Sequence, residues 1–216
     1  MPLFPSPLPR SFYERDPRTV ARELLGKVLL RRISSRKIMA GRIVEDEAYL
    51  GTHDPAAHAY SGITKRNAVL FGPAGHAYVY FTYGMHHCMN ISCQATGRAG
   101  CVLIRALEPI SGFEEMAIAR NMNREQGEWT SAKTRLLTSG PGRLCQALRI
   151  ERAEDNGKDV TSPHSDLQVV EAHGLPLPLE ESKYRIVTAT RVDISQAADR
   201  KLRYLIAGNP FVSVKP

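Results

Sequence analysis

The sequence has few aromatic residues, few cysteines and no long hydrophobic run. Aromatic side chains make up 7% of the 216 residues. The longest uncharged apolar runs, at residues 77–83 and 101–104, have the length of strands, whereas a helix that crosses a bilayer needs about 20 apolar residues. We therefore expect no membrane association. The four cysteines form no Cys-x-x-Cys pair, which indicates buried free thiols rather than a disulfide framework.

The charge is unbalanced towards the basic side. Lysine and arginine total 29 against 22 acidic residues, which gives a net charge of +7 and a pI near 9.4. This balance makes a polyanion such as nucleic acid a candidate partner, although a soluble protein with a modest positive excess would show the same numbers. Apolar residues at 43% and charged residues at 24% are ordinary for a globular protein and exclude a disordered chain.

The chain predicts an N-terminal arm followed by one domain. Residues 1–15 carry four prolines by Pro9 and no basic head before an apolar run, which predicts a flexible Pro-rich arm and not a secretion signal. Residues 16–216 contain several strand patterns and scattered helix patterns. This mixture predicts a single domain of the α+β class.

Local patterns predict where the elements lie. Asp16 as N-cap, Pro17 in the first turn and Gly26 at the end predict a first helix. A capping-box pattern at residues 111–114 predicts a helix that runs to about Asn121, and residues 121–134 are expected to form an exposed loop. A short helix should follow residues 139–142. Strands are expected at residues 27–31, 38–49, 77–83, 88–93, 101–107, 203–207 and 211–214.

Strand alternation predicts which side chains lie together. In the second strand it places one set of residues on a common face: Met39, Gly41, Ile43, Glu45, Glu47 and Tyr49. The strands at 77–83 and 88–93 form a hairpin around Gly84-Met85, in which Tyr78 and Tyr80 share one face, as do Cys88 and Asn90. In the strand at 101–107, Leu103, Arg105 and Leu107 share a side.

Tyrosine and histidine are concentrated in one part of the chain. Five of the eight tyrosines lie between Tyr49 and Tyr83, and five of the seven histidines lie between His53 and His87. Tyrosines favour the half-buried strands of a sheet, which is one explanation. The other is a pocket with aromatic walls, which in a basic protein would hold an unstacked nucleic-acid base.

Acidic residues gather at the end of the predicted strand 38–49. Because Glu45, Asp46 and Glu47 repel one another, at least one must be solvated, paired or raised in pKa. The segment is either an exposed strand end or the site of a general base that deprotonates water. Arg105 on its strand should face inward and needs an acidic partner, for which Glu47 is a candidate. A purely structural salt bridge would explain the same pair.

Three further groups of residues have alternative interpretations. Glycines at residues 140 and 142 open a helix beside Arg143, which is either a phosphate site or a simple helix start. The basic pair Lys65-Arg66 is either a second phosphate contact or solvated surface. His53, Asp54, His58 and the pair His86-His87 could ligate a metal, but their spacing matches no standard zinc signature. We therefore expect no metal and no cofactor.

Several segments form an ordered set of motifs along the chain: Gly41-Arg42-Ile43-Val44-Glu45-Asp46-Glu47-Ala48-Tyr49-Leu50-Gly51, Ala56-Ala57-His58, Tyr78-Val79-Tyr80, Tyr83-Gly84-Met85, Cys88-Met89-Asn90-Ile91-Ser92, Arg105-Ala106-Leu107-Glu108-Pro109 and Ser139-Gly140-Pro141. Taken in this order, they resemble the alkyladenine (3-methyladenine) DNA glycosylases of the mammalian alkyl-purine type. The resemblance extends from about Leu25 to Leu148 and weakens to residues 208–214 near the end. One departure is His87, where relatives tend to carry an apolar aromatic residue.

The resemblance implies a role for each matching residue. Glu47 would be the general base that activates water, and Arg105 would help to hold that water. The implied base-contacting and DNA-contacting roles are the following: Tyr49, His58 and Tyr80 sandwich the flipped purine, Tyr78 supports the pocket, Ala56 makes a main-chain contact, Asn90 clashes with the 2-amino group of guanine, Tyr83 is a wedge in the minor groove, and Arg143 contacts a phosphate. The implied fold has a curved, largely antiparallel β-sheet, surrounding helices and a protruding hairpin near Tyr83.

The implied activity is that of a monofunctional, cofactor-free glycosylase of base-excision repair. It would flip damaged purines out of double-stranded DNA, as a monomer, in the bacterial cytoplasm or a eukaryotic nucleus. The alternatives are a glycosylase restricted to cationic bases such as 3-methyladenine, a non-catalytic base-stacking module, and a metal-dependent hydrolase built on His53, His58 and His86.

Overall fold

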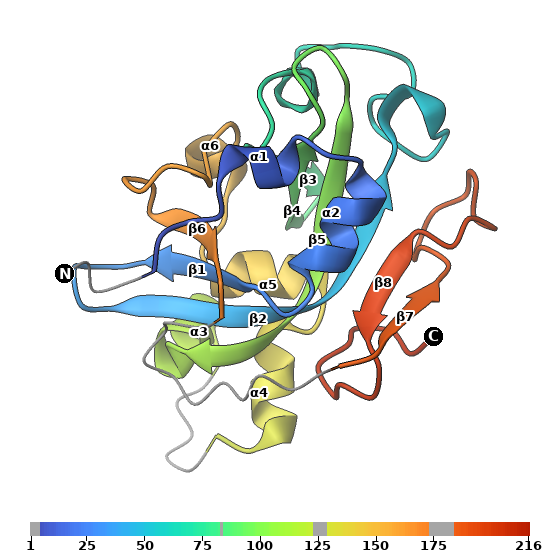
Figure 1. Ribbon diagram of the computed structural model, residues 1–216. Coiled ribbons are helices and arrows are strands. Elements are labelled where there is room, and N and C mark those ends of the chain that lie inside the picture. The colour runs from blue at the N-terminus through green and yellow to red at the C-terminus, as the bar shows by residue number, and fades with distance from the viewer. Residues whose placement is uncertain (1–4, 83, 123–128, 173–183) are drawn as a thin grey trace.

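The fold is built around one long strand, β2 (Ile38–Tyr49), in a computed structural model that describes residues 5–82, 84–122, 129–172 and 184–216 (Figure 1). The sheet has the strand order β3-β4-β5-β2-β1-β6, and β8 pairs with both β2 and β7. Each of these pairings is antiparallel. The other strands are β1 (Val28–Arg32), β3 (Ala77–Thr82), β4 (His86–Cys93), β5 (Gly100–Ser111), β6 (Leu167–Val170), β7 (Ile186–Ala189) and β8 (Arg203–Ile206).

Strand β2 changes partner along one of its edges, and this curls the sheet. Its first half, from Ile38 to Arg42, pairs with β1, whereas Glu45 to Glu47 pair with β8. On its other edge β2 pairs with β5 from Ala40 to Tyr49. The β3–β4 hairpin extends beyond the sheet, because β4 pairs with β5 only over Asn90–Cys93. The predicted α+β domain with a curved antiparallel sheet and a protruding hairpin is confirmed.

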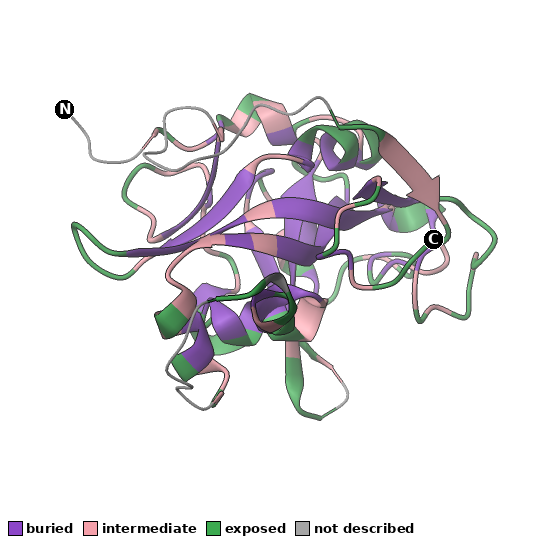
Figure 2. Cartoon of the chain, turned by 90° about the horizontal axis from the view of Figure 1, so that it is seen from below, coloured by how far each residue is buried: buried purple, intermediate pink, exposed green. Residues whose placement is uncertain are grey.

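Helices cover the sheet and complete the core. They are α1 (Arg10–Tyr13), α2 (Pro17–Leu24), α3 (Phe113–Ala119), α4 (Ser131–Thr138), α5 (Pro141–Ala147) and α6 (Arg152–Asp155), with the 3₁₀ turns η1 (Gly51–His53) and η2 (Ala68–Phe71). Helix α2 begins as predicted, since the side chain of Asp16 accepts a hydrogen bond from the backbone N–H of Arg18. It packs on β2 and β5, and α5 packs on β4 and β5. Figure 2 shows most of the strands buried along most of their length, whereas β7 is only partly buried.

Three predicted elements differ from the structure. Strand β5 continues to Ser111, so the capping box is not formed, and α3 instead follows Gly112 at φ +79°, where a Cβ would lie 2.6 Å from the carbonyl oxygen of Ile38. Helix α4 lies partly in the segment 121–134 that was expected to be an exposed loop, and Thr130 caps it. Residues 211–214 form turns and not a strand.

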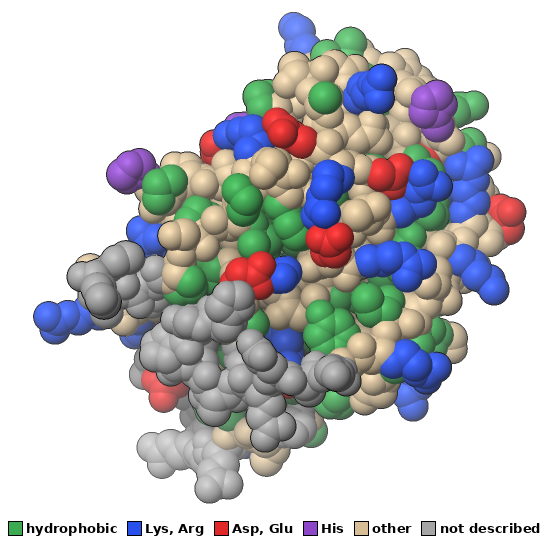
Figure 3. Space-filling view, in the orientation of Figure 1, with side chains coloured by type: hydrophobic (Ala, Val, Ile, Leu, Met, Phe, Trp, Pro, Cys, Tyr) green, Lys and Arg blue, Asp and Glu red, His purple; other side chains and the backbone are tan. Residues whose placement is uncertain are grey.

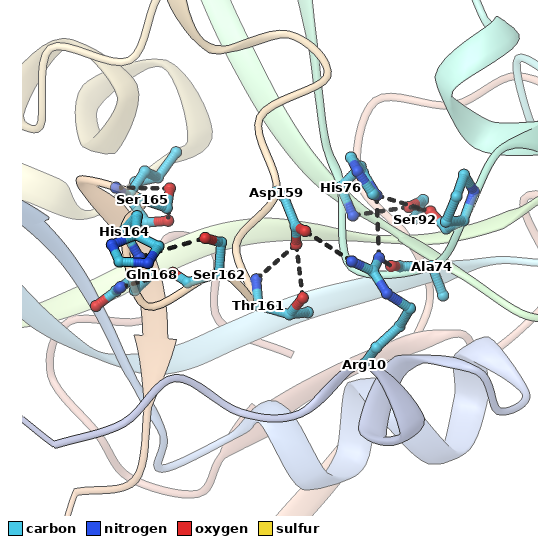
Figure 4. Close-up of polar contacts among 12 residues, drawn as sticks. Arg10, Ala74, His76, Ser92, Asp159, Thr161, Ser162, His164, Ser165 and Gln168 are labelled. Carbon is cyan, nitrogen blue, oxygen red and sulfur yellow. Dashed lines mark hydrogen bonds and ion pairs between the residues drawn. The ribbon is translucent and has the colours of Figure 1, made fainter.

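The N-terminal segment packs on the domain from Leu8 onwards, which differs from the flexible arm expected over residues 1–15. The N–H of Leu8 donates to the carbonyl of Val169 at 2.8 Å. Figure 4 shows Arg10 between Asp159 and the carbonyl of Ala74, and its Nη2 lies 2.6 Å from the Asp159 carboxylate. Tyr13 is fully buried. The expectation of a flexible arm is therefore wrong for this part of the segment.

The positive charge is not gathered in one place on the face that Figure 3 displays. Lysine and arginine side chains are spread over it, with acidic side chains among them. A nucleic-acid surface therefore has to be argued from a site and not from net charge alone.

Candidate active site

A pocket of about 270 Å³ opens beside the β3–β4 hairpin. It also takes in the end of β2 and the residues that follow β7. The predicted site residues that line it are Tyr49, Ala56, His58, Tyr78, Tyr80, Asn90 and Arg105. Positions far apart in the sequence are thus brought to one cavity, slightly smaller than the about 300–1,000 Å³ usual for small-molecule sites.

Irregular pairing between β2 and β5 aims the charged side chains. The register passes from Ile43–Leu107 to Glu45–Ala106 and then to Asp46–Ile104, so that it skips Val44 on β2 and Arg105 on β5. Extra residues of this kind re-aim side chains in a sheet. The single common face predicted for residues 39–49 is therefore wrong, because Met39 and Ile43 belong to the main core whereas Tyr49 lines the pocket. Likewise Leu103 and Arg105 line the pocket, but Leu107 lies in the core.

Glu47 is buried beneath the pocket and does not itself line it. One carboxylate oxygen, Oε1, accepts a hydrogen bond from the N–H of Val192 at 2.8 Å and lies 3.3 Å from Nη1 of Arg105. The other, Oε2, accepts from the hydroxyl of Tyr49 at 2.9 Å. All three of these partners line the pocket. The carboxylate therefore lies directly behind the wall of the cavity, and three residues of that wall fix its orientation.

The charges around Glu47 form a buried network. Glu45 Oε1 lies 3.2 Å from Arg105 Nε and 2.9 Å from Arg203 Nη1, and the N–H of Ser213 donates to its Oε2 at 2.6 Å. Two carboxylates thus share two guanidinium groups. Arg105 forms ion pairs with both Glu45 and Glu47, and it also lines the pocket. The structural salt bridge and the role at the pocket are therefore not exclusive. The exposed strand end considered for residues 45–47 is excluded, because all three carboxyls are fully buried.

Burial and hydrogen bonds pull the pKa of Glu47 in opposite directions. Burial raises the pKa above its ordinary value, and the Arg105 guanidinium, the Val192 N–H and the Tyr49 hydroxyl bring it part of the way back. A general base works best when its pKa lies near the working pH. The environment therefore suits a carboxylate that takes up a proton during a reaction.

Asp46 lies on the opposite face of β2 from Glu47. The register from Asp46–Ile104 to Tyr49–Cys101 is regular, so Asp46 points with Ile104 and Ala48 into the main core. Neither carboxyl oxygen has a hydrogen-bond partner. Burial, followed by the charges of Glu45 and Glu47, raises the pKa of Asp46 well above its usual range. Its surroundings therefore favour the protonated form of this carboxyl over the ionised one.

Replacing Asp46 with Asn should therefore stabilise the protein at high pH. In the wild type the unfolded chain ionises at Asp46 above pH 3.8, whereas the raised pKa makes the folded chain release this proton only at higher pH, so stability falls as the pH rises between the two values. Asn cannot ionise and removes that loss, by about 1.4 kcal/mol for each pH unit between the two pKa values. Urea unfolding of both proteins at pH 4 and pH 8 tests this. The gain in stability of Asp46→Asn over the wild type should be larger at pH 8, and an equal gain at both pH values would contradict the prediction.

Histidine and tyrosine rings form one wall of the pocket. The rings of His58 and Tyr80 contact each other with centroids 4.6 Å apart, and Tyr78 lies 5.7 Å from Tyr80. Nδ1 of His58 and the hydroxyl of Tyr78 are 3.0 Å apart. Burial and the nearby Arg66 lower the pKa of His58, so its ring is neutral near pH 7. Three tyrosines of the cluster, Tyr49, Tyr78 and Tyr80, thus line the pocket, whereas Tyr60 is exposed.

Asn90 is fixed by two neighbours. Its Nδ2 donates to the carbonyl of Tyr78 at 3.3 Å, and its Oδ1 accepts from the thiol of Cys101 at 3.6 Å. These contacts hold the amide in one orientation at the pocket wall. Cys101 is one of four cysteines that are free and buried, as predicted.

Of the three predicted DNA contacts, the structure describes Arg66 and Arg143. Tyr83 lies outside the described residues. The guanidinium of Arg66 lies 5.8 Å from the centre of the Tyr80 ring, so this residue borders the pocket. Arg143 is exposed and follows Pro141, which lines the pocket. Helix α5 has seven residues, so any phosphate contact here depends on the charge of Arg143 and not on a long helix dipole.

Sequence reasoning missed the residues between β7 and β8. Val192, Asp193 and Ile194 line the pocket, and Arg191 lies behind Tyr49. They follow an ordinary strand in a stretch without a periodic pattern, so no local signal marked them. The burial of Arg191, which calls for an acidic partner, becomes visible only in the structure.

Across the described ranges, no three or more His, Cys, Asp or Glu side chains are grouped to hold a metal ion. His58 lines the pocket while His86 lines a different hollow, beside His87 and Gly142. None of the described helices is long and apolar enough to cross a membrane.

Known proteins share this sequence over nearly its whole length. A family profile described as Methylpurine-DNA glycosylase (MPG) matches residues 11–210. The chain belongs to the methylpurine-DNA glycosylase family. Relatives include proteins named as 3-methyladenine DNA glycosylases from Koribacter versatilis, 54% identical over 97% of this chain and 94% of the relative, and from Carboxydothermus hydrogenoformans, 44% identical over 96% and 99%. The DNA-3-methyladenine glycosylase of Mus musculus is 43% identical over 94% of this chain and 60% of the mouse protein.

Membership of the methylpurine-DNA glycosylase family makes the chain an N-glycosylase, and the resemblance found in the sequence is confirmed. It also identifies DNA as the kind of substrate. Which bases are removed, and which residues act on them, are questions for the geometry of the pocket.

Proposed function

We propose that this glycosylase flips a damaged purine, alkylated or deaminated, out of double-stranded DNA and hydrolyses its N-glycosidic bond with a water activated by Glu47. The product is an abasic site. The observation that carries the proposal is the buried Glu47 carboxylate, held by Tyr49 and Arg105 at the base of an aromatic pocket. A carboxylate in such a place can take a proton from water beside a base in the pocket.

The purine would stack between aromatic side chains. His58 and Tyr80 contact each other and act as one wall, so the ring of the base would lie between them and Tyr49. The fixed amide of Asn90 would clash with the 2-amino group of guanine and exclude undamaged guanine. Flipping costs a few kcal/mol of stacking and pairing, and a side chain inserted at the tip of the hairpin would offset part of this cost.

Charge favours the chemical step. Positive charge develops on the sugar as the base leaves, and an ionised Glu47 stabilises it while accepting the proton of the attacking water. Arg105 would help to position that water. An amine nucleophile would be needed to cleave the strand as well. No lysine is among the described residues that line the pocket, which supports a monofunctional reaction in which water is the nucleophile.

Excision assays on defined lesions test the proposal. The protein would be incubated with duplexes that carry one 3-methyladenine, hypoxanthine or ethenoadenine, and abasic sites would be scored with and without a chelator. We expect excision that the chelator does not affect. Excision of 3-methyladenine alone would instead support the enzyme restricted to cationic bases. Binding without excision of any lesion would overturn the proposal in favour of a base-stacking module, and loss of activity in chelator would favour a metal hydrolase.

We propose that the protein binds the duplex as a monomer and that Arg143 contacts a DNA phosphate beside the pocket. Arg143→Ala should then weaken binding to all duplexes alike. The slope of the logarithm of the binding constant against the logarithm of the salt concentration should become smaller in magnitude by about one. Fluorescence titrations at several salt concentrations measure this slope. The matched control is Arg36→Ala. Arg36 is exposed and lies in the turn before β2, at the opposite end of that strand from Tyr49. An unchanged slope for Arg143→Ala would count against the contact.

A further inference from the structure

A buried ion pair lies behind the wall of the pocket. Arg191 and Asp54 are 137 residues apart in the sequence, and the guanidinium donates two hydrogen bonds to the carboxylate, with Nη1–Oδ2 at 2.5 Å and Nη2–Oδ1 at 2.8 Å. Both side chains are 0% exposed. Burying two charges is costly even when they are paired, so stability alone is a weak reason for such a pair.

Arg191 contacts two residues next to the proposed base. Its guanidinium lies 4.6 Å from the centre of the ring of Tyr49, and the hydroxyl of this tyrosine donates a hydrogen bond to Glu47. Its Nη1 also donates to the carbonyl of Ala48 at 3.1 Å. The next residue in the chain, Val192, donates its N–H to Glu47. A shift of Arg191 would therefore move two of the groups that hold the carboxylate.

Asp54 connects the ion pair to the loop that carries Ala56 and His58. Its carboxylate accepts hydrogen bonds from the N–H of Leu50 at 3.2 Å and from the N–H of Ala56 at 3.3 Å. Because Ala56 lines the pocket, the ion pair connects three pieces of the site: the end of β2, the loop after η1 and residues 190–194.

Side chains, and not the backbone hydrogen bonds between paired strands, orient the N–H of Val192. Residues 190–194 lie outside β7 and β8. The segment is held on one side by the Arg203 Nε bond to the carbonyl of Thr190, at 2.7 Å, and on the other by Arg191. Asp193, directly after Val192, has φ +57°, a conformation that most residues adopt only when their surroundings impose it.

We infer that Asp54 and Arg191 form a positioning pair, which keeps the Val192 N–H on Glu47 and the Tyr49 ring against the pocket. The inference rests on the proposed role of Glu47 as general base. Neither residue of the pair touches the reacting atoms. Their effect is exerted through the hydrogen bond that favours the ionised carboxylate over the protonated one.

The consequence is visible in the pH dependence of the rate. The Val192 N–H lowers the pKa of Glu47 against the effect of burial, so losing this bond raises that pKa. The reaction needs ionised Glu47, and its rate falls as the pH drops through this pKa. A disturbed pair should therefore move the acidic limb of the profile to higher pH.

Single-turnover excision rates between pH 5 and pH 9 test the inference with Arg191→Lys and Asp54→Asn. Lysine keeps the charge but cannot make both bonds to Asp54. For each variant we expect the acidic limb to move up by about half a unit or more and the maximal rate to fall about 10- to 100-fold. Thermal unfolding shows that the assays are run on folded protein. Arg191→Lys, which leaves no buried charge unpaired, is the milder variant.

The control is a buried pair away from the pocket. Arg31 lies 2.8 Å from Asp155, with side chains 9% and 0% exposed, and lines no part of the site. Arg31→Lys should lower the unfolding temperature without moving the acidic limb. An unmoved limb in folded Arg191→Lys would overturn the positioning role while leaving the proposed function intact. The proposed function itself fails if wild-type protein excises no purine, or if Glu47→Gln excises as fast as wild type.

Discussion

Replacing Glu47 with Gln is expected to lower the single-turnover excision rate by about 10³-fold or more. A general base contributes about 10²- to 10⁴-fold, and the same carboxylate also stabilises the positive charge on the sugar. Gln keeps the size of the side chain but cannot take a proton from water. Binding should change little, because the stacking rings and the rim of the pocket remain. Rates and dissociation constants on a lesion duplex would be measured together.

The matched control for this variant is Asp46→Asn, one residue earlier on the same strand. Both changes turn a fully buried carboxyl into an amide, but Asp46 points into the core and Glu47 towards the pocket. The control should excise at nearly the wild-type rate. If the two variants lost activity to a similar extent, a general disturbance of β2 would explain the result, and the proposed role of Glu47 as general base would be contradicted.

Much of the fold could be predicted because its signals are local, and seven of the sixteen residues that line the pocket were predicted as site residues. Asp16 and Pro17 mark the start of α2, and the alternation of Tyr78 and Tyr80 places both on one side of the hairpin, where the structure has them. The identities of the pocket residues came from the family resemblance, which depends on motifs read in order along the chain.

The parts that could not be predicted depend on distant contacts. The bulges that skip Val44 and Arg105 arise from how β5 pairs with β2, and strict alternation cannot show them. The bond from Val192 to Glu47 joins positions 145 residues apart. Tyr13 is buried because α1 packs on the domain, although the prolines before it suggest a free arm.

The largest expected effect on stability is that of Arg105→Met. Four buried charges balance in the wild type, since Arg105 and Arg203 face Glu45 and Glu47. Burial would lower the pKa of Arg105, but Glu47 and Glu45 outweigh it and raise the value, so the guanidinium is always charged. Removing it leaves the buried carboxylate of Glu47 without a positive charge beside it. Such a loss costs about 3–5 kcal/mol at pH 8.

The pH dependence of that loss identifies its cause. Without Arg105 the pKa of folded Glu47 rises further above its unfolded value of 4.5, so the variant loses stability as the pH rises above that value and regains most of it near pH 4, where the carboxyl is protonated in both states. Urea unfolding at pH 4 and pH 8 measures both ends. Arg42→Met is the control, since Arg42 pairs with Glu108 across the same two strands while both side chains remain partly solvated. Its loss should be about 1 kcal/mol or less. A loss for Arg105→Met that is equally large at both pH values would mean that packing of the long side chain, and not its charge, stabilises this part of the sheet.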